Sequence, residues 1–306
     1  MNNQTESGID RKNAKLGFVG LGLMGSRLSR RLHKSGWNIQ VWNRSPEPVR
    51  LLQEEGINSA DSIENLVAGS NVILSSLSND SAVRSVYLDK GGIFPSAEAG
   101  AIVLEMSTIS PDLSRLLHNR ASALGIGFLD LAVSGSTPAV DAGAVTLLAG
   151  GDQKTFDRCI PIFESIAKQW FLIGEGSSGI RMKLVVNLLL GVNMQAIAEA
   201  VSLGTHLQID RNVLINVLSK TTVIAPALVG KLEKVRNGDY SPQFPLRLMS
   251  KDMDLVLDAA RASGAELPAT SVVQSDFLSA LASNGNLDMS AIASFILNRV
   301  DETVLA

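Results

Sequence analysis

Apolar and polar positions in the first half of the chain follow two alternating periods. Short runs of branched and aromatic residues are separated by longer segments in which apolar residues recur every three or four positions. The first pattern is typical of strands and the second of amphipathic helices. Strands are predicted over 16–20, 39–43, 72–77, 101–106 and 128–133, with helices over 24–35, 47–55, 62–66, 81–88 and 111–124. Two further strands, 146–149 and 170–173, are expected at sheet edges and flank a helix over 155–168.

This alternation favours an α/β fold with a Rossmann-type, doubly wound and mostly parallel sheet. The hydrophobic pattern changes after Gly174-Glu175-Gly176. From Gly179 onward it is helical and shows no clear strand. We therefore expect a disordered polar tail over 1–14, a Rossmann domain over 15–176 and an all-α C-terminal domain over 177–306.

A glycine-rich turn follows the first predicted strand and opens a helix. Gly20, Gly22 and Gly25 are spaced as GxGxxG, with Leu23 and Met24 at the start of the helix. The three glycines would allow a tight turn, close approach of the backbone to a phosphate and close packing of helix on strand. Backbone N–H groups at a helix N-terminus bind a pyrophosphate, so this turn predicts a dinucleotide site.

The residues after the second strand bear on which dinucleotide is bound. Folds that bind NAD usually place an acidic residue there against the ribose 2′-hydroxyl. This chain has Asn43 and Arg44 instead. A guanidinium pairs with a 2′-phosphate, so NADP(H) is the preferred cofactor. NAD(H) stays possible if Arg44 is a solvated surface side chain.

Composition narrows the remaining classes of function. The net charge of −3 and the aromatic content of 5% argue against nucleic acid as a partner. The single cysteine, Cys159, excludes a disulfide within the chain and suits a reducing, cytoplasmic setting. Three scattered histidines predict no metal site. Residues 1–13 lack an apolar signal segment, and polar residues interrupt the apolar stretch 184–200, so we expect a buried helix and no membrane partner.

Lys183 and Asn187 are the first candidates for chemistry. They lie four residues apart and share one face of an otherwise apolar predicted helix. A lysine that is partly desolvated in a cleft gives up its proton more readily, and its charge stabilises a developing alkoxide. The alternative is that Lys183 extends to solvent at the start of the helix.

Two loops that follow predicted strands could complete a site. One is 107–111, in which Ser110 can also cap the following helix with Pro111 at its first position. The other contains Ser134, Gly135 and Ser136. Hydroxyls and backbone amides at the carboxyl edge of a sheet suit a small anionic substrate.

These segments together resemble the β-hydroxyacid dehydrogenase family, which includes 3-hydroxyisobutyrate dehydrogenase, tartronate semialdehyde reductase and glyoxylate/succinic semialdehyde reductase. The resemblance runs from about Lys15 to the C-terminal helices. The segments that carry it are Gly-Phe-Val-Gly-Leu-Gly-Leu-Met-Gly (17–25), Ser107-Thr108, Val133-Ser134-Gly135, Gly179…Lys183…Asn187 and Lys251-Asp252.

The resemblance implies a role for each matching position. Lys183 matches the lysine that protonates the carbonyl oxygen, and Asn187 matches an asparagine that helps to hold the substrate. Ser134 and Gly135 match the loop that binds the substrate carboxylate, while Thr108 and Lys251 match residues near the nicotinamide. The family fold joins a Rossmann domain by a long helix to a helical domain that usually dimerises, so a homodimer or homotetramer is expected.

Within the family the chain resembles the glyoxylate/succinic semialdehyde reductase branch. The segments 134–139 and 244–246 carry this resemblance, which implies that Ser136, Phe244 and Asp252 line the substrate pocket. Phe244 is equally interpreted as a packing residue. Ala132 replaces the usual proline and Val186 the usual first asparagine, and both changes bear on the substrate. The cofactor contacts expected in all are Gly20, Gly22, Leu23, Met24, Gly25, Asn43, Arg44, Ser45, Leu77, Thr108 and Lys251.

The resulting hypothesis is an NADPH-dependent oxidoreductase that reduces a short aldehyde acid, of the glyoxylate or succinic semialdehyde type, to the hydroxy acid. Lys183 is the expected proton donor. The alternatives are oxidation with NAD(P) like that of 3-hydroxyisobutyrate dehydrogenase, an imine reductase, and a non-catalytic cofactor-binding dimerisation module. Imine reductases usually carry another residue in place of the lysine, so Lys183 weighs against that alternative.

Overall fold

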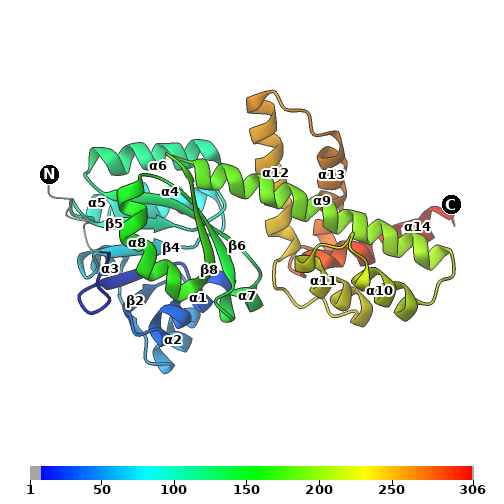
Figure 1. Ribbon diagram of the computed structural model, residues 1–306, viewed down its shortest axis with the longest axis horizontal. Coiled ribbons are helices and arrows are strands. Elements are labelled where there is room, and N and C mark those ends of the chain that lie inside the picture. Colours follow the sequence, from blue (N-terminus) through cyan, green and yellow to red (C-terminus); the bar gives the residue numbers. More distant parts are fainter. Residues whose placement is uncertain (1–7, 305–306) are drawn as a thin grey trace. The chain divides into compact units, whose positions relative to one another are not determined.

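The computed structural model describes residues 8–304, which form two compact units (Figure 1). The first unit extends to Lys183 and the second begins at Leu184. Of the disordered tail expected over 1–14, residues 1–7 lie outside the described residues. The described part makes specific contacts: Ile9 N donates to Arg158 O over 2.9 Å, and the Arg11 guanidinium lies 5.1 Å from the centre of the Trp37 ring.

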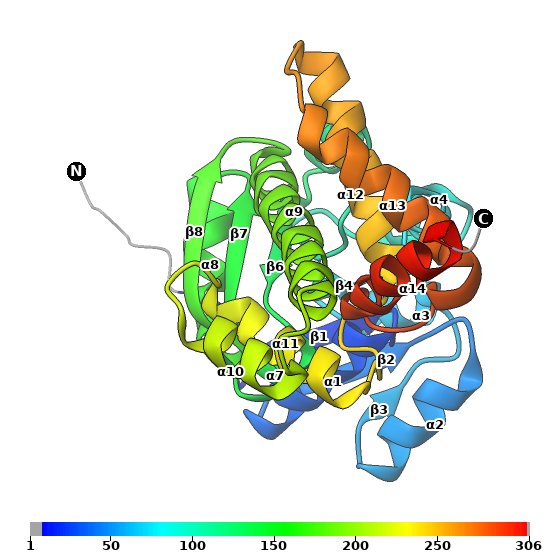
Figure 2. The ribbon, with the colours of Figure 1, turned by 90° about the vertical axis from the view of Figure 1, so that its right-hand side faces the viewer.

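The first unit contains one eight-stranded sheet in the order β3-β2-β1-β4-β5-β6-β7-β8. Neighbouring strands are parallel except for β6 and β7, which are antiparallel; with β8 they lie side by side in Figure 2. The strands are β1 (Lys15–Val19), β2 (Asn38–Trp42), β3 (Asn58–Ser59), β4 (Val72–Ser75), β5 (Ile102–Glu105), β6 (Gly127–Ser134), β7 (Val145–Gly150) and β8 (Ala167–Gly174). The predicted Rossmann-type α/β class is confirmed.

Helices connect these strands. They are α1 (Leu23–Lys34), α2 (Pro46–Glu54), α3 (Ile63–Ala68), α4 (Asp80–Leu88), α5 (Ile93–Ser96), α6 (Pro111–Ala123), α7 (Thr137–Asp141) and α8 (Gln153–Ile166). They lie close to the predicted positions, except that the sequence pattern does not predict the short helices α5 and α7. One expectation was wrong, because the strand predicted over 146–149 is β7, which lies between β6 and β8 and is not an edge. A local pattern shows that a strand is buried but does not specify its neighbours. The edge strand β3 is too short for a visible alternation.

Side chains alternate between the two faces of the sheet, and each face has its own core. Leu16 and Phe18 of β1 pack on one face with Leu28 of α1 and Phe163 of α8. On the other face, the rings of Tyr87, Phe94 and Phe128 pack edge to face, with centroids 5.2–6.3 Å apart. Both faces are therefore covered by helices, as expected of a doubly wound sheet.

The second unit is helical. Its elements are the greater part of α9 (Ser178–His206), then α10 (Arg211–Lys220), α11 (Pro226–Asn237), α12 (Leu246–Ser263), α13 (Pro268–Asn284), the short 3₁₀ helix η1 (Met289–Ala291) and α14 (Ile292–Val304). By length and composition alone α9 is the one described helix that could cross a membrane; an 18-residue window of it has a mean hydropathy of 1.6 and is 44% buried. Met194, Ile197 and Val201 of this helix are buried in the core of the second unit.

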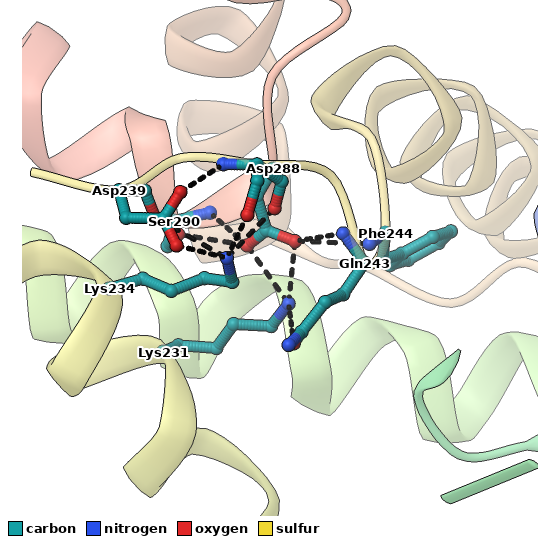
Figure 3. Close-up of polar contacts among 8 residues, drawn as sticks. Lys231, Lys234, Asp239, Gln243, Phe244, Asp288 and Ser290 are labelled. Carbon is teal, nitrogen blue, oxygen red and sulfur yellow. Dashed lines mark hydrogen bonds and ion pairs between the residues drawn. The ribbon is translucent and has the colours of Figure 1, made fainter. Parts of the chain in front are cut away.

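A buried ion pair fixes the loop that leads into α12 (Figure 3). The Asp288 carboxylate lies 2.7 Å from Lys231 Nζ, and the two side chains are 0% and 6% exposed. The same carboxylate accepts from the backbone N–H groups of Gln243 and Phe244 over 2.9 and 3.0 Å. Burial alone raises the pKa of Asp288, but Lys231 and these N–H groups more than offset it, so the pKa lies below its usual value.

Asp288→Ala should destabilise the folded chain by about 3–5 kcal/mol, because it leaves the Lys231 ammonium buried without its counter-charge. Urea unfolding followed by circular dichroism measures this difference. The matched control is Asp258→Ala on α12, whose partner Arg261 and own side chain are both largely exposed. An exposed pair contributes less than about 1 kcal/mol. Equal losses in the two variants would contradict this account of the Asp288 network.

Candidate active site

The glycine-rich turn at the end of β1 has the geometry that a dinucleotide requires. Gly20 has a φ of +94°, and a Cβ there would lie 2.4 Å from Ser76 O. A Cβ on Gly25 would lie 1.9 Å from Gly20 O, so α1 packs directly on the turn. A Cβ on Gly22, at the N-cap of α1, would meet nothing within 4 Å. Gly22 therefore leaves the space beside the first N–H groups of α1 that a pyrophosphate fills.

The end of β2 is tied to this turn. Asn43 Oδ1 accepts from Leu21 N over 2.9 Å, and Asn43 Nδ2 donates to Ser45 O over 3.0 Å. Arg44 and Ser45 are exposed, and Ser45 caps α2 without a hydrogen bond from its own side chain. The end of β2 thus presents an exposed guanidinium and an exposed hydroxyl, groups that could contact the ribose of a bound NAD(P).

Buried polar side chains form a row across the neighbouring strands of the same sheet. Ser75 pairs with Glu105 in register, and Glu105 pairs with Asp130. Glu105 accepts from Ser107 N over 3.1 Å and from Ser107 Oγ, while Ser107 Oγ accepts from Leu77 N over 2.7 Å. The row thus holds together the segments that contain Leu77 and Thr108, two of the predicted cofactor contacts.

Burial raises the pKa of the Glu105 carboxyl to about 8, against the opposing effect of the hydrogen bonds from Ser107. No described lysine or arginine is among the groups that shift it, and the nearby Asp130 raises the pKa further. Near neutral pH this carboxyl is therefore mostly protonated.

The loop predicted to hold a substrate carboxylate follows β6. Ser134 is the last residue of this strand and Ser136 caps α7, without a hydrogen bond from its side chain to the helix. A Cβ on Gly135 would lie 2.8 Å from a methyl group of Val145. Because β6 is parallel to β5, this loop leaves the same edge of the sheet as the glycine-rich turn. The hydroxyls and N–H groups of the loop suit an anionic group.

Lys183 lies at the end of the first unit, in the second turn of α9, and is 9% exposed. At the start of this helix, Ile180 N donates to Asp130 Oδ2 over 2.6 Å. The alternative in which Lys183 extends into solvent does not fit this burial.

In the second unit, Asn187, Lys251 and Asp252 form a connected group. Asn187 Nδ2 donates to Asp252 Oδ2 over 2.6 Å, and Lys251 Nζ lies 2.7 Å from Asp252 Oδ1. Asn187 is fully buried, yet its Oδ1 has no hydrogen-bond partner among the described residues. A buried acceptor of this kind suits a donor supplied by a ligand.

Phe244 precedes α12 in the loop that Asp288 holds, and it packs half-buried against the core of the second unit. The structure thus supports the packing interpretation of Phe244 and leaves its contact with substrate a prediction.

Three residues that hold the site in place are not among those that the sequence pattern predicts. They are Glu105, Asp130 and Asp288, carboxylates that are each 2% exposed or less. The available signal was a charged residue inside a strand that is otherwise apolar, at Glu105 and Asp130. Ser110 does cap α6, as expected, by accepting from Leu113 N over 3.2 Å.

The chain matches two protein families in succession. Residues 15–174 match the NAD binding domain of 6-phosphogluconate dehydrogenase, and residues 177–296 match the NAD-binding domain of NADP-dependent 3-hydroxyisobutyrate dehydrogenase. These matches and the glycine-rich turn define the class: the protein is an NAD(P)-dependent oxidoreductase.

Full-length relatives are similar over almost the whole chain. The chain is 30% identical to 2-(hydroxymethyl)glutarate dehydrogenase of Eubacterium barkeri, over 92% of this chain and 94% of the relative. It is also 30% identical to glyoxylate/succinic semialdehyde reductase 1 of Arabidopsis thaliana, over 91% and 96%. The crystal structure of 3-hydroxyisobutyrate dehydrogenase from Salmonella typhimurium has a TM-score of 0.85 at 28% identity, covering 92% of this chain and 100% of that one. The chain belongs to the β-hydroxyacid dehydrogenase family.

The raised pKa of Glu105 predicts a pH-dependent stability. The folded chain holds this proton more tightly than the unfolded chain, so the contribution of Glu105 is full below about pH 4.5 and falls until the pH passes about 8. In Glu105→Gln the side chain is neutral at every pH and has nearly the shape of the protonated carboxyl. The stability of the wild type relative to this variant should therefore fall by about 1.4 kcal/mol per pH unit between pH 5.5 and 7.5.

Urea unfolding at several pH values measures this difference. Glu98→Gln is the matched control, because Glu98 is exposed and its replacement should give a difference that does not change over the same range. A constant difference for Glu105→Gln would show that this carboxyl is ionised in the folded chain throughout.

Proposed function

We propose that this protein uses NADPH to reduce a short aldehyde acid, of the glyoxylate or succinic semialdehyde type, to the hydroxy acid. The observation that carries the proposal is the buried Lys183, which is followed one turn later on the same helix by the unpaired acceptor of Asn187. The similarity to the Arabidopsis reductase along almost the whole chain supports this substrate class.

In the proposed reaction, Ser134 and Gly135 bind the substrate carboxylate through a hydroxyl and a backbone N–H group. Reduced nicotinamide, when bound, supplies a hydride to the carbonyl carbon. Lys183 gives a proton from Nζ to the carbonyl oxygen, so the new C–H and O–H bonds form without a free alkoxide. Asn187 holds the hydroxyl of the product through its Oδ1, and Lys251 and Asp252 fix the Asn187 amide.

The preference for NADPH rests on the end of β2. Arg44 and Ser45 supply a guanidinium and a hydroxyl, and no carboxylate stands at the position that would repel a 2′-phosphate. Oxidation of a hydroxy acid, as in 3-hydroxyisobutyrate dehydrogenase, is the second candidate, since the same groups run the reaction in reverse and the relatives include that enzyme. A screen of NADPH oxidation with glyoxylate, succinic, tartronate and methylmalonate semialdehydes, and a cyclic imine, separates the substrates.

Lys183→Ala should lower kcat by about 10²–10⁴-fold, the usual contribution of a positioned acid, and leave the Kd of NADPH unchanged. Steady-state kinetics and a fluorescence titration with NADPH measure the two effects. Lys220→Ala, at the exposed end of α10, is the control that should keep full activity. Wild-type kcat in the Lys183 variant would show that Lys183 is not the proton donor.

Arg44→Ala should raise the KM for NADPH by about 10–100-fold, because it removes a charge-assisted contact worth about 1.5–3 kcal/mol. The KM for NADH should stay within about twofold, since NADH lacks the 2′-phosphate. Arg50→Ala removes an exposed arginine from the neighbouring helix α2 and should change neither value. An unchanged ratio of the two KM values in the Arg44 variant would contradict the preference for NADPH.

A further inference from the structure

The N-terminus of α9 is held by a carboxylate from the sheet. The first N–H groups of a helix have no acceptor within the helix. Asp130 of β6 supplies one, since its Oδ2 accepts from Ile180 N over 2.6 Å. The carboxylate also lies at the end of the helix where negative charge is stabilised. Ile180 is three residues before Lys183 and on the same side of the helix.

The second oxygen of Asp130 is fixed from the opposite side. Asp130 Oδ1 lies 2.7 Å from Nε2 of His118, which is on α6. The His118 ring packs edge to face on Phe128, with the ring centroids 4.7 Å apart. Both side chains of the pair are largely buried, with His118 15% and Asp130 3% exposed. Asp130 therefore cannot rotate without breaking a bond at each end.

Two glycines let the helix begin directly against the strands. A Cβ on Gly179 would lie 2.6 Å from Asp130 O and from Leu148 O. A Cβ on Gly150 would lie 2.3 Å from Asp130 Oδ1 and 2.8 Å from Ser178 N. The beginning of α9 thus lies in backbone contact with β6 and β7. The Asp130 carboxylate lies between the start of the helix and these strands.

We propose that Asp130 and His118 form a positioning pair that sets the place of the Lys183 ammonium through the first turn of α9. This inference rests on the proposed function, because it acts through Lys183. A shift of about 1 Å at a reacting group can lower the rate about 100-fold. A carboxylate that fixes the start of the helix therefore affects the rate of the proton transfer.

The test is a double-mutant cycle of Asp130→Ala with Lys183→Ala. Alone, Asp130→Ala should lower kcat by about 10–100-fold and leave the Kd of NADPH within about twofold. In the Lys183→Ala background it should have no further effect on the residual kcat, because residues that act as a unit are non-additive. Asp130→Asn keeps an oxygen acceptor for Ile180 N and should recover most of the lost kcat.

Asp152→Ala is the matched control. Asp152 Oδ1 accepts from Thr155 N over 2.8 Å at the start of α8, a helix that has no proposed role in the chemistry. This variant should lower Tm but keep kcat within about twofold. His118→Phe keeps a ring against Phe128 without the bond to Asp130, and should lower kcat several-fold even if Asp130→Ala does not fold.

The outcomes separate the two proposals. An inactive Lys183→Ala together with full kcat in His118→Phe, and in any folded Asp130→Ala, overturns the positioning pair alone. The positioning pair is also overturned if Asp130→Ala slows the Lys183→Ala protein by the factor seen in the wild type. Full kcat in Lys183→Ala overturns the proposed function, and the positioning pair with it.

Discussion

A buried carboxylate that lacks hydrogen-bond partners is too costly for a folded chain to keep. Among the residues whose side chains the structure describes, four carboxylates are 2% exposed or less, and each holds a segment that contains a candidate functional residue. They are Glu105, Asp130, Asp252 and Asp288. Glu105 holds Ser107 beside Thr108, Asp130 holds the start of α9, Asp252 holds Asn187, and Asp288 holds the loop with Phe244.

What surrounds each carboxylate decides its charge. Asp288 has the Lys231 ammonium and two backbone N–H groups from the loop, and these outweigh desolvation, so its pKa is lowered. Glu105 has hydroxyls and one backbone N–H group, and Asp130 is its neighbour in register, so desolvation dominates and the pKa rises to about 8. This difference in charge suits the surroundings of each carboxylate. A neutral Glu105 puts no negative charge at the sheet edge where an anionic cofactor is expected, whereas a charged Asp288 neutralises a buried lysine.

The sequence predicts the elements that depend on local pattern, and the glycine-rich turn above all. Gly20 has a positive φ and Gly25 packs against Gly20 O, so the spacing of these glycines carries a local geometry that the structure shows. The position of β7 within the sheet and the formation of the short strand β3 depend on partner strands elsewhere in the chain. A short stretch of sequence does not contain these partners. The same limit applies to the site: Lys183 is visible on its helix, but the partners of Asp130 lie 12 and 50 residues away.

Polar residues inside otherwise apolar strands are therefore the most useful sequence signal that hydrophobic periodicity alone does not detect. Replacing a buried polar network by apolar residues of similar volume is often neutral or stabilising, so stability alone does not require Asp130 or Glu105 in the strands β6 and β5. An apolar residue at Asp130 would pack against the aromatic side chains of its face but could not accept from Ile180 N. The helix would then keep its length and lose its fixed starting point. A carboxylate at this position is explained by the need to place α9, and with it Lys183, at a defined point on the sheet.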